Sequence, residues 1–254
     1  MEMNYNYIFQ FPNRCLLNKR LTKVFFTKNF DLTSSEKKIL NTHVTKMEWV
    51  ASIKPSNSNI PKFENDLYVF DEIQLMTCKI SSAADKIVKT VAELFHKYIP
   101  YPIVLVIEDD SHWTLSTSSK RVNQNDRSKR TIERLYISSP ISVEAVNKSV
   151  EEFKSTLPFP QLNKTNLMTV YQEYVDAMIQ LQSYHLTGVF NGERTHRSNE
   201  DLEHLLRIET IQTELISLKS QLKKETQLNS RVSINMEIQR RKQDIENIKN
   251  TLIQ

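Results

Sequence analysis

The segment Asp71-Glu72-Ile73-Gln74 holds the residues whose types and spacing best suit metal chemistry. In a strand, Glu72 and Gln74 would point to the same side, so both side chains could address one Mg²⁺ ion. Asp66 or Asp71 would supply the second carboxylate that such a site needs. The alternative is a half-exposed strand whose polar residues face solvent, because these two positions lie opposite the apolar ones. Both interpretations stay open at this point.

A second group of candidate residues is basic. Residues 118–134 carry six basic side chains against Asp126 and Glu133, and amide side chains lie between them. Such a composition is typical of an exposed connection that contacts DNA phosphates, although a solvated hairpin tip has the same composition. The candidate DNA-binding residues are Lys120, Arg121, Arg127, Lys129, Arg130 and Arg134. Residues 3–30 hold five more basic residues and no acid, but Phe25 and Phe26 suggest packing there.

The composition argues against several other kinds of chemistry. The two glycines, Gly188 and Gly192, are too few and wrongly placed for a phosphate loop, a dinucleotide fingerprint or a nucleophile elbow. Cys15 and Cys78 cannot form a disulfide framework, and the six histidines lack zinc-site spacing. We therefore expect no resident metal or cofactor, with Mg²⁺ as the alternative stated above. Reduced thiols and the lack of a long apolar run predict a cytoplasmic protein without a membrane span.

The elements that would position these residues alternate between helix and strand. Thr33 and Glu36 have capping-box spacing at the start of a helix, and Leu67, Val69, Ile73 and Leu75 share one face of a strand over residues 67–80. The expected helices cover residues 32–44 and 83–98, and the other expected strands cover residues 47–53, 103–107, 112–117 and 131–137. This order predicts a mixed α/β sheet domain over residues 1–145.

Residues 146–254 are predicted to be a long helical, coiled-coil-like part, which makes the whole chain α+β. A helix over 165–185 ends before Gly188, and seams with 3-4 spacing follow within residues 199–253. The chain there is either one long helix with a phase break or a hairpin. Because the seams need an apolar surface in this chain or in another, their residues are the expected partner-binding set: Ile208, Ile211, Leu215, Leu218, Leu222, Ile238, Ile245, Ile248 and Leu252.

Several short stretches resemble one bacterial family, catalogued as domain of unknown function 4391. They are Phe11-Pro12, residues 47–55, Asn59-Ile60, residues 71–74, residues 99–102 and residues 224–235. The resemblance implies an α/β part with a helical tail. It also implies a setting in restriction or phage-defence clusters, beside helicases and DNA methyltransferases.

Two functions follow as expectations. The first is a non-catalytic accessory subunit of a DNA-targeting restriction or anti-phage complex. It would bind a helicase or methyltransferase subunit through the tail and DNA through the basic segment, and the C-terminal helices could also join copies into a homo-oligomer. The second is a Mg²⁺-dependent nuclease using Glu72, because the order of elements resembles that of the restriction-endonuclease-like core. Whether the chain is an enzyme stays open.

Overall fold

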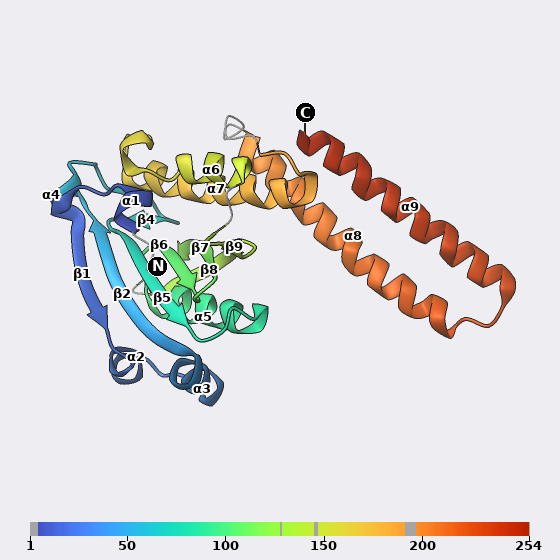
Figure 1. Cartoon of the computed structure of the whole chain (residues 1–254), viewed down its shortest axis with the longest axis horizontal. Helices are drawn as coiled ribbons and strands as arrows, with labels where there is room; N and C mark the ends of the chain where they lie inside the picture. The colour runs from blue at the N-terminus through green and yellow to red at the C-terminus, as the bar shows by residue number, and fades with distance from the viewer. Residues whose placement is uncertain (1–4, 128, 145–146, 191–196, 254) are drawn as a thin grey trace. The chain divides into compact units, whose positions relative to one another are not determined.

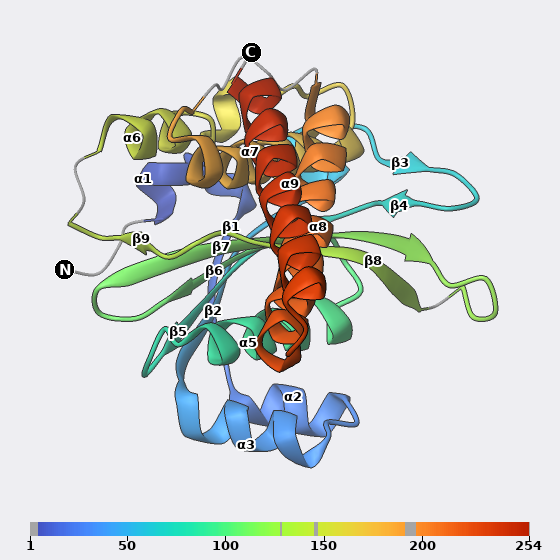
Figure 2. The same ribbon diagram turned by 90° about the vertical axis from the view of Figure 1, so that its right-hand side faces the viewer.

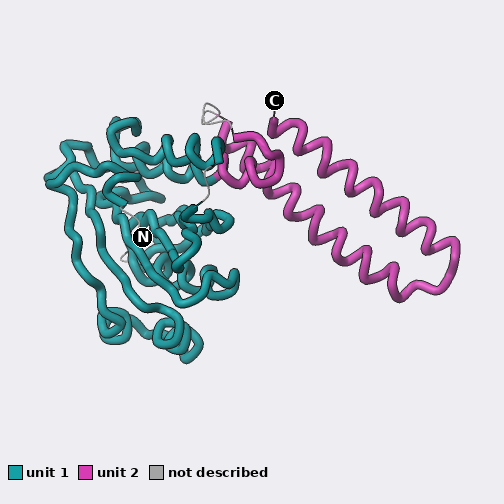
Figure 3. Tube along the Cα trace, in the orientation of Figure 1, with its two compact units in different colours: residues 1–178 teal, residues 179–254 magenta. Residues whose placement is uncertain are grey.

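A seven-stranded mixed β-sheet organises the first part of the chain, and a pair of long helices forms the last part. The computed structural model describes residues 5–127, 129–144, 147–190 and 197–253. These residues fall into two compact units, Met1–Met178 and Ile179–Gln254 (Figure 3). The α+β class predicted from the sequence is confirmed.

The elements keep the predicted order and add several short ones. The strands are β1 (Leu16–Leu21), β2 (Val44–Ile53), β3 (Phe63–Glu64), β4 (Val69–Phe70), β5 (Ile73–Ile80), β6 (Ile103–Glu108), β7 (His112–Val122), β8 (Arg130–Ile137) and β9 (Ile141–Ser142). The helices are α1 (Tyr5–Phe9), α2 (Lys23–Asn29), α3 (Ser34–His43), α4 (Pro55–Ser58), α5 (Asp85–Tyr98), α6 (Lys148–Ser155), α7 (Leu167–Thr187), α8 (Ser198–Lys224) and α9 (Leu228–Ile253), with single 3₁₀ turns at Asn13–Cys15 and Phe159–Gln161. No helix within the described ranges combines the length and the apolar character that crossing a membrane requires.

The sheet has the strand order β1-β2-β5-β6-β7-β8, with β9 also pairing with β7 (Figure 1). Strands β1, β2 and β5 are antiparallel neighbours, whereas β5 and β6 are parallel. A parallel pair needs a crossover connection, and α5 supplies it. At one edge lies β1, whose four central residues are exposed.

Both faces of the sheet are covered. On one face, Met76, Cys78 and Leu105 join Phe95 of α5 in a buried cluster that also takes in α2 and α3. On the other face, Trp113 stacks on Phe153 of α6 with 6.2 Å between the ring centroids. The capping box of α3 forms as predicted, with Thr33 and Glu36 each bonding the backbone of the other.

The predicted strand over residues 67–80 is wrong in two respects. The chain forms β4 and β5 instead, separated at Asp71 and Glu72, and β5 is buried on both faces rather than on one. The reason is that β5 lies between β2 and β6 in the middle of the sheet. Gln74, which one of the two open interpretations placed toward solvent, is therefore completely buried.

The division between the two compact units falls within α7. The expected boundary between the sheet domain and the helical part near residue 145 stays a prediction. The first half of α7 packs on the sheet, where the Tyr171 hydroxyl lies within hydrogen-bond distance of the carbonyl oxygens of Ile103 (3.1 Å) and Ser118 (3.0 Å) and can donate to either one. At the other end of α7, Gly188 adopts a positive φ of 75° and its N–H bonds the Tyr184 carbonyl at 2.7 Å. Gly188 thus ends this helix as predicted.

Helices α8 and α9 form an antiparallel hairpin, which decides between the two alternatives left open for the tail (Figure 1). Three residues, 225–227, join them at the place where the phase of the seam breaks. Ile208, Ile211 and Leu215 of α8 are buried, as are Ile238, Ile245 and Leu252 of α9. An ion pair of 3.0 Å between Glu214 and Arg241 links the two helices.

Candidate functional site

Glu72, the centre of the expected metal site, contacts two residues at the end of β2 and just after it. Its carboxylate accepts a hydrogen bond from the Ser52 hydroxyl and lies 3.3 Å from the Lys54 ammonium. Burial raises the pKa of Glu72, but the hydrogen bond from Ser52 and the charge of Lys54 outweigh it, so the pKa lies below its usual value. Glu72 is therefore ionised and held in an ion pair.

Asp71 lies outside this environment, whereas Gln74 contributes to it, because its side chain also lowers the pKa of Glu72. The Asp71 side chain is exposed, whereas the Gln74 side chain is buried and accepts a hydrogen bond from the indole N–H of Trp49. Within the described ranges, no three His, Cys, Asp or Glu side chains are grouped so that they could hold a metal ion. The Mg²⁺ alternative stays a prediction.

The basic segment forms the β7–β8 ribbon, residues 112–122 and 130–137, and its tip, residues 123–127 and 129. The prediction that Lys120 is exposed is wrong: its relative exposure is 6%. Since β7 continues to Val122, Lys120 points inward, where its ammonium donates to the carbonyls of Ile99 (2.7 Å) and Tyr101 (2.8 Å). Burial, with a smaller contribution from the charge of Arg130, lowers the pKa of Lys120 to about 7.

The other basic residues of this segment differ in how far they are neutralised. Arg121 lies 3.6 Å from Glu133, and Lys129 lies 3.1 Å from Asp126. Arg134 is half-buried with its guanidinium 5.5 Å from the centre of the Tyr136 ring. Arg127 and Lys129 are exposed and Arg130 is half-buried, so these three are the best placed to meet a phosphate backbone.

The ribbon does not stand alone, because the β3–β4 hairpin runs beside it (Figure 2). The N–H of Val122 donates to the carbonyl of Leu67 at 2.7 Å. The pKa of Glu64 is lowered by Lys62 first and then by the charges of Arg127 and Arg130, which places these arginines near the hairpin. The β3–β4 hairpin and the β7–β8 ribbon together form one surface.

A buried polar cluster beneath the ribbon was not predicted from the sequence. His96 of α5 is fully enclosed, with Nε2 3.1 Å from the Ser116 hydroxyl and Nδ1 2.8 Å from the Ser118 hydroxyl. Burial and the nearby charge of Lys120 hold the pKa of His96 well below its usual value, so the ring is neutral. The available signal was the alternation of Ser116, Ser118 and Lys120, which places all three on the face of β7 toward α5.

In the tail, the seam residues pack α8 against α9, which is the same-chain alternative left open for them. Ile208, Ile211, Leu215, Ile238, Ile245 and Leu252 are buried, and Leu218, Leu222 and Ile248 are half-buried. A different set faces solvent: Leu228, Val232 and Met236 of α9 are 75%, 51% and 69% exposed. Because they are spaced by four residues, these three form one face of the helix, here called the outer stripe. The sequence pattern did not predict this stripe, because its three residues lie outside the seam positions of α9.

The described features define a protein with a sheet covered on both faces, a basic ribbon and a helical hairpin tail. A family model described as a domain of unknown function (DUF4391) matches residues 9–245, so the chain belongs to that family. No curated protein and no solved structure matches the chain.

Proposed function

We propose that this protein is an accessory subunit of a DNA-targeting restriction or anti-phage complex. In this role the α8–α9 hairpin binds a helicase or DNA methyltransferase subunit, and the tip of the β7–β8 ribbon contacts DNA. The partner subunit carries out the catalytic step of the complex. This function agrees with the setting that the family resemblance implies.

The outer stripe is the observation that supports the proposal most. A hairpin whose seam is already buried has no structural need for three large apolar side chains on its outside. Exposed apolar side chains on one helix face are typical of a surface that another protein covers. Ile216 of α8, 71% exposed, adds apolar surface to the same hairpin.

The ribbon supports the DNA contact through charge. Arg127, Lys129 and Arg130 lie near one another, because an Nη of Arg130 donates to the carbonyls of Arg127 (3.0 Å) and Lys129 (3.2 Å). Lysine and arginine on a projecting ribbon can release condensed counterions from DNA. Asp126 offsets part of this charge, which favours a modest contact that complements the partner's own grip on DNA.

The test is reconstitution with a helicase or methyltransferase subunit of the same system, followed by mass measurement of the complex. Changing Val232 and Met236 to Asp should abolish the complex while the helical content stays the same. Asn235→Asp on the same helix, at an exposed polar position, is the matched control and should leave it intact. A complex that survives the double substitution contradicts the role of the stripe. A stable dimer of the isolated chain that the substitution dissociates would instead assign the stripe to self-association.

A further inference from the structure

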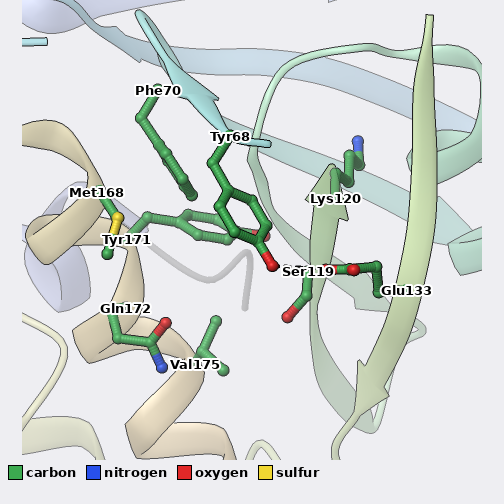
Figure 4. Close-up of a pocket in the computed structure, with 9 residues that line it drawn as sticks. All are labelled: Tyr68, Phe70, Ser119, Lys120, Glu133, Met168, Tyr171, Gln172 and Val175. Carbon is green, nitrogen blue, oxygen red and sulfur yellow. Dashed lines mark hydrogen bonds between the residues drawn. The ribbon is translucent and has the colours of Figure 1, made fainter. Parts of the chain in front are cut away.

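A pocket of about 240 Å³ lies where the β3–β4 hairpin, the β7–β8 ribbon and α7 meet (Figure 4). Its walls are largely aromatic: Tyr68 and Phe70 come from the hairpin side and Tyr171 from α7. The rings of Phe70 and Tyr171 have centroids 5.9 Å apart. The lining also includes the aliphatic side chains of Met168 and Val175 and polar groups of Ser119, Glu133 and Gln172. Flat apolar walls with a few polar groups suit a planar ligand that can form hydrogen bonds.

The aromatic walls are held in place before any ligand arrives. The Tyr171 hydroxyl accepts a hydrogen bond from the Ser118 N–H at 2.9 Å and donates its one hydrogen to the backbone carbonyl of Ile103 or of Ser118. The Tyr68 hydroxyl donates to Glu133 at 3.1 Å. Fixed rings lose little conformational entropy when a ligand stacks on them, which favours binding.

The charges around the pocket argue for a neutral ring rather than a cation. Among the described residues that line it, Glu133 is the one acid, and it already lies 3.6 Å from the guanidinium of Arg121. Lys120 also lies along the lining, but its side chain points away from the pocket (Figure 4) and its ammonium bonds the carbonyls of Ile99 and Tyr101. A ligand cation would therefore meet a carboxylate whose charge is largely compensated.

Basic residues lie on one side of the pocket, along the ribbon that leads to its tip. Glu133 and Gln172 are exposed, so the pocket opens to solvent between β8 and α7. Glu133 lies three residues from Arg130 on the strand that leads to the ribbon tip. A ligand that joins a planar ring to phosphate groups would match both the pocket and the tip.

We propose that the pocket binds an unpaired base of single-stranded DNA, with the neighbouring phosphates held by Arg127, Lys129 and Arg130. This inference rests on the DNA contact proposed above and specifies its substrate. The base stacks on the aromatic walls, and its edge bonds the Gln172 amide and the Ser119 hydroxyl. A volume of about 240 Å³ is below the range of drug-sized sites, as expected of a pocket for a single base. A single strand also presents its bases without the cost of opening a duplex.

The experiment compares the affinities of the full chain for a labelled single-stranded 12-mer, the matching duplex and an abasic 12-mer with the same phosphates. Phe70→Leu and Gln172→Ala test the pocket, and Leu67→Ala, in the exposed turn of the same hairpin, is the control. Because Phe70→Leu removes one stacking ring, it should weaken single-strand binding about 5- to 150-fold. Duplex binding should not change. The abasic strand should bind the wild-type chain at least as weakly as the normal strand binds the Phe70→Leu variant, because it loses every base contact and not only one stacking ring.

The outcomes separate this inference from the proposed function. If single strand, duplex and abasic strand bind alike and Phe70→Leu has no effect, the pocket is not a base site, while the DNA contact stands. If none of the three binds, the DNA contact itself fails and the inference fails with it. A free deoxynucleotide that binds as tightly as the 12-mer would overturn the assignment to a DNA strand.

Discussion

Ile211→Ala should destabilise the isolated protein through the α8–α9 hairpin. Ile211 has a relative exposure of 0%, so truncation leaves a cavity in the seam and removes apolar surface that folding buries. Substitutions of this kind cost about 2–5 kcal/mol. If the hairpin opens locally, a destabilisation of about 2–5 kcal/mol raises its open population by roughly 30- to 4000-fold, since 1.4 kcal/mol corresponds to a factor of about ten.

Hydrogen exchange of the α9 amides measures this opening directly. The amides from Ile238 to Leu252 should exchange faster by that factor, and the change should not depend on protein concentration, because both seams belong to one chain. Ile216→Ala is the matched control: it is the same substitution on the same helix at a side chain that is 71% exposed, and it should change exchange by less than about twofold.

Two outcomes would contradict the view that the seam within one chain holds α8 to α9. If Ile211→Ala had no more effect than Ile216→Ala, the seam would not be what holds α8 to α9. If its effect vanished at high protein concentration, the seam would be completed by a second molecule.

Three further predictions concern the sheet domain. Lys120 has a pKa of about 7 in the folded state and about 10.4 when unfolded, so between these values the unfolded chain holds a proton that the folded chain lacks. The free energy of unfolding should therefore rise by about 1.5 kcal/mol from about pH 7 to about pH 8.5 through this group, and urea titrations of Lys120→Met should lack that increment. Glu72→Ala should lower stability by about 1 kcal/mol, as expected for a half-exposed ion pair, and should leave the activity of the reconstituted complex intact. Cleavage of DNA by the purified chain with Mg²⁺ or Mn²⁺ that Glu72→Ala abolishes would instead establish the nuclease alternative. Changing Arg127, Lys129 and Arg130 to Ala should weaken DNA binding and reduce the slope of log K against log salt by about 0.9 for each phosphate that the variant no longer neutralises, and an unchanged slope would contradict the ribbon contact.

The sequence predicted the elements of this fold well where local signals were strong. The capping box at Thr33 and Glu36, the apolar run at Ile103–Ile107 and the glycine after α7 all mark elements that the structure confirms. β1 was missed because its exposed polar residues show no buried face. β5 was misjudged because its burial on both faces depends on neighbours far away in the sequence.

The candidate site was harder to predict, for reasons of geometry. Six basic residues in 118–134 look equivalent in the sequence, but strand alternation turns Lys120 into the core, whereas Arg127 lies in the tip between the strands and is exposed. The pocket walls come from Phe70 and Tyr171, about one hundred positions apart, and no local pattern connects them. The seams were recognised correctly, yet their periodicity is the same for a hairpin and for an intermolecular coiled coil.

The edge strand β1 has a consequence for solubility. Its outer side presents unpaired backbone groups to which another extended chain could add, which is how many sheets begin to aggregate. Lys19 and Arg20 occupy the exposed middle of this strand, and like charges on an approaching copy would repel it. Replacing both with valine should turn this border into a nucleus for fibrous assembly, whatever the tail and the ribbon bind.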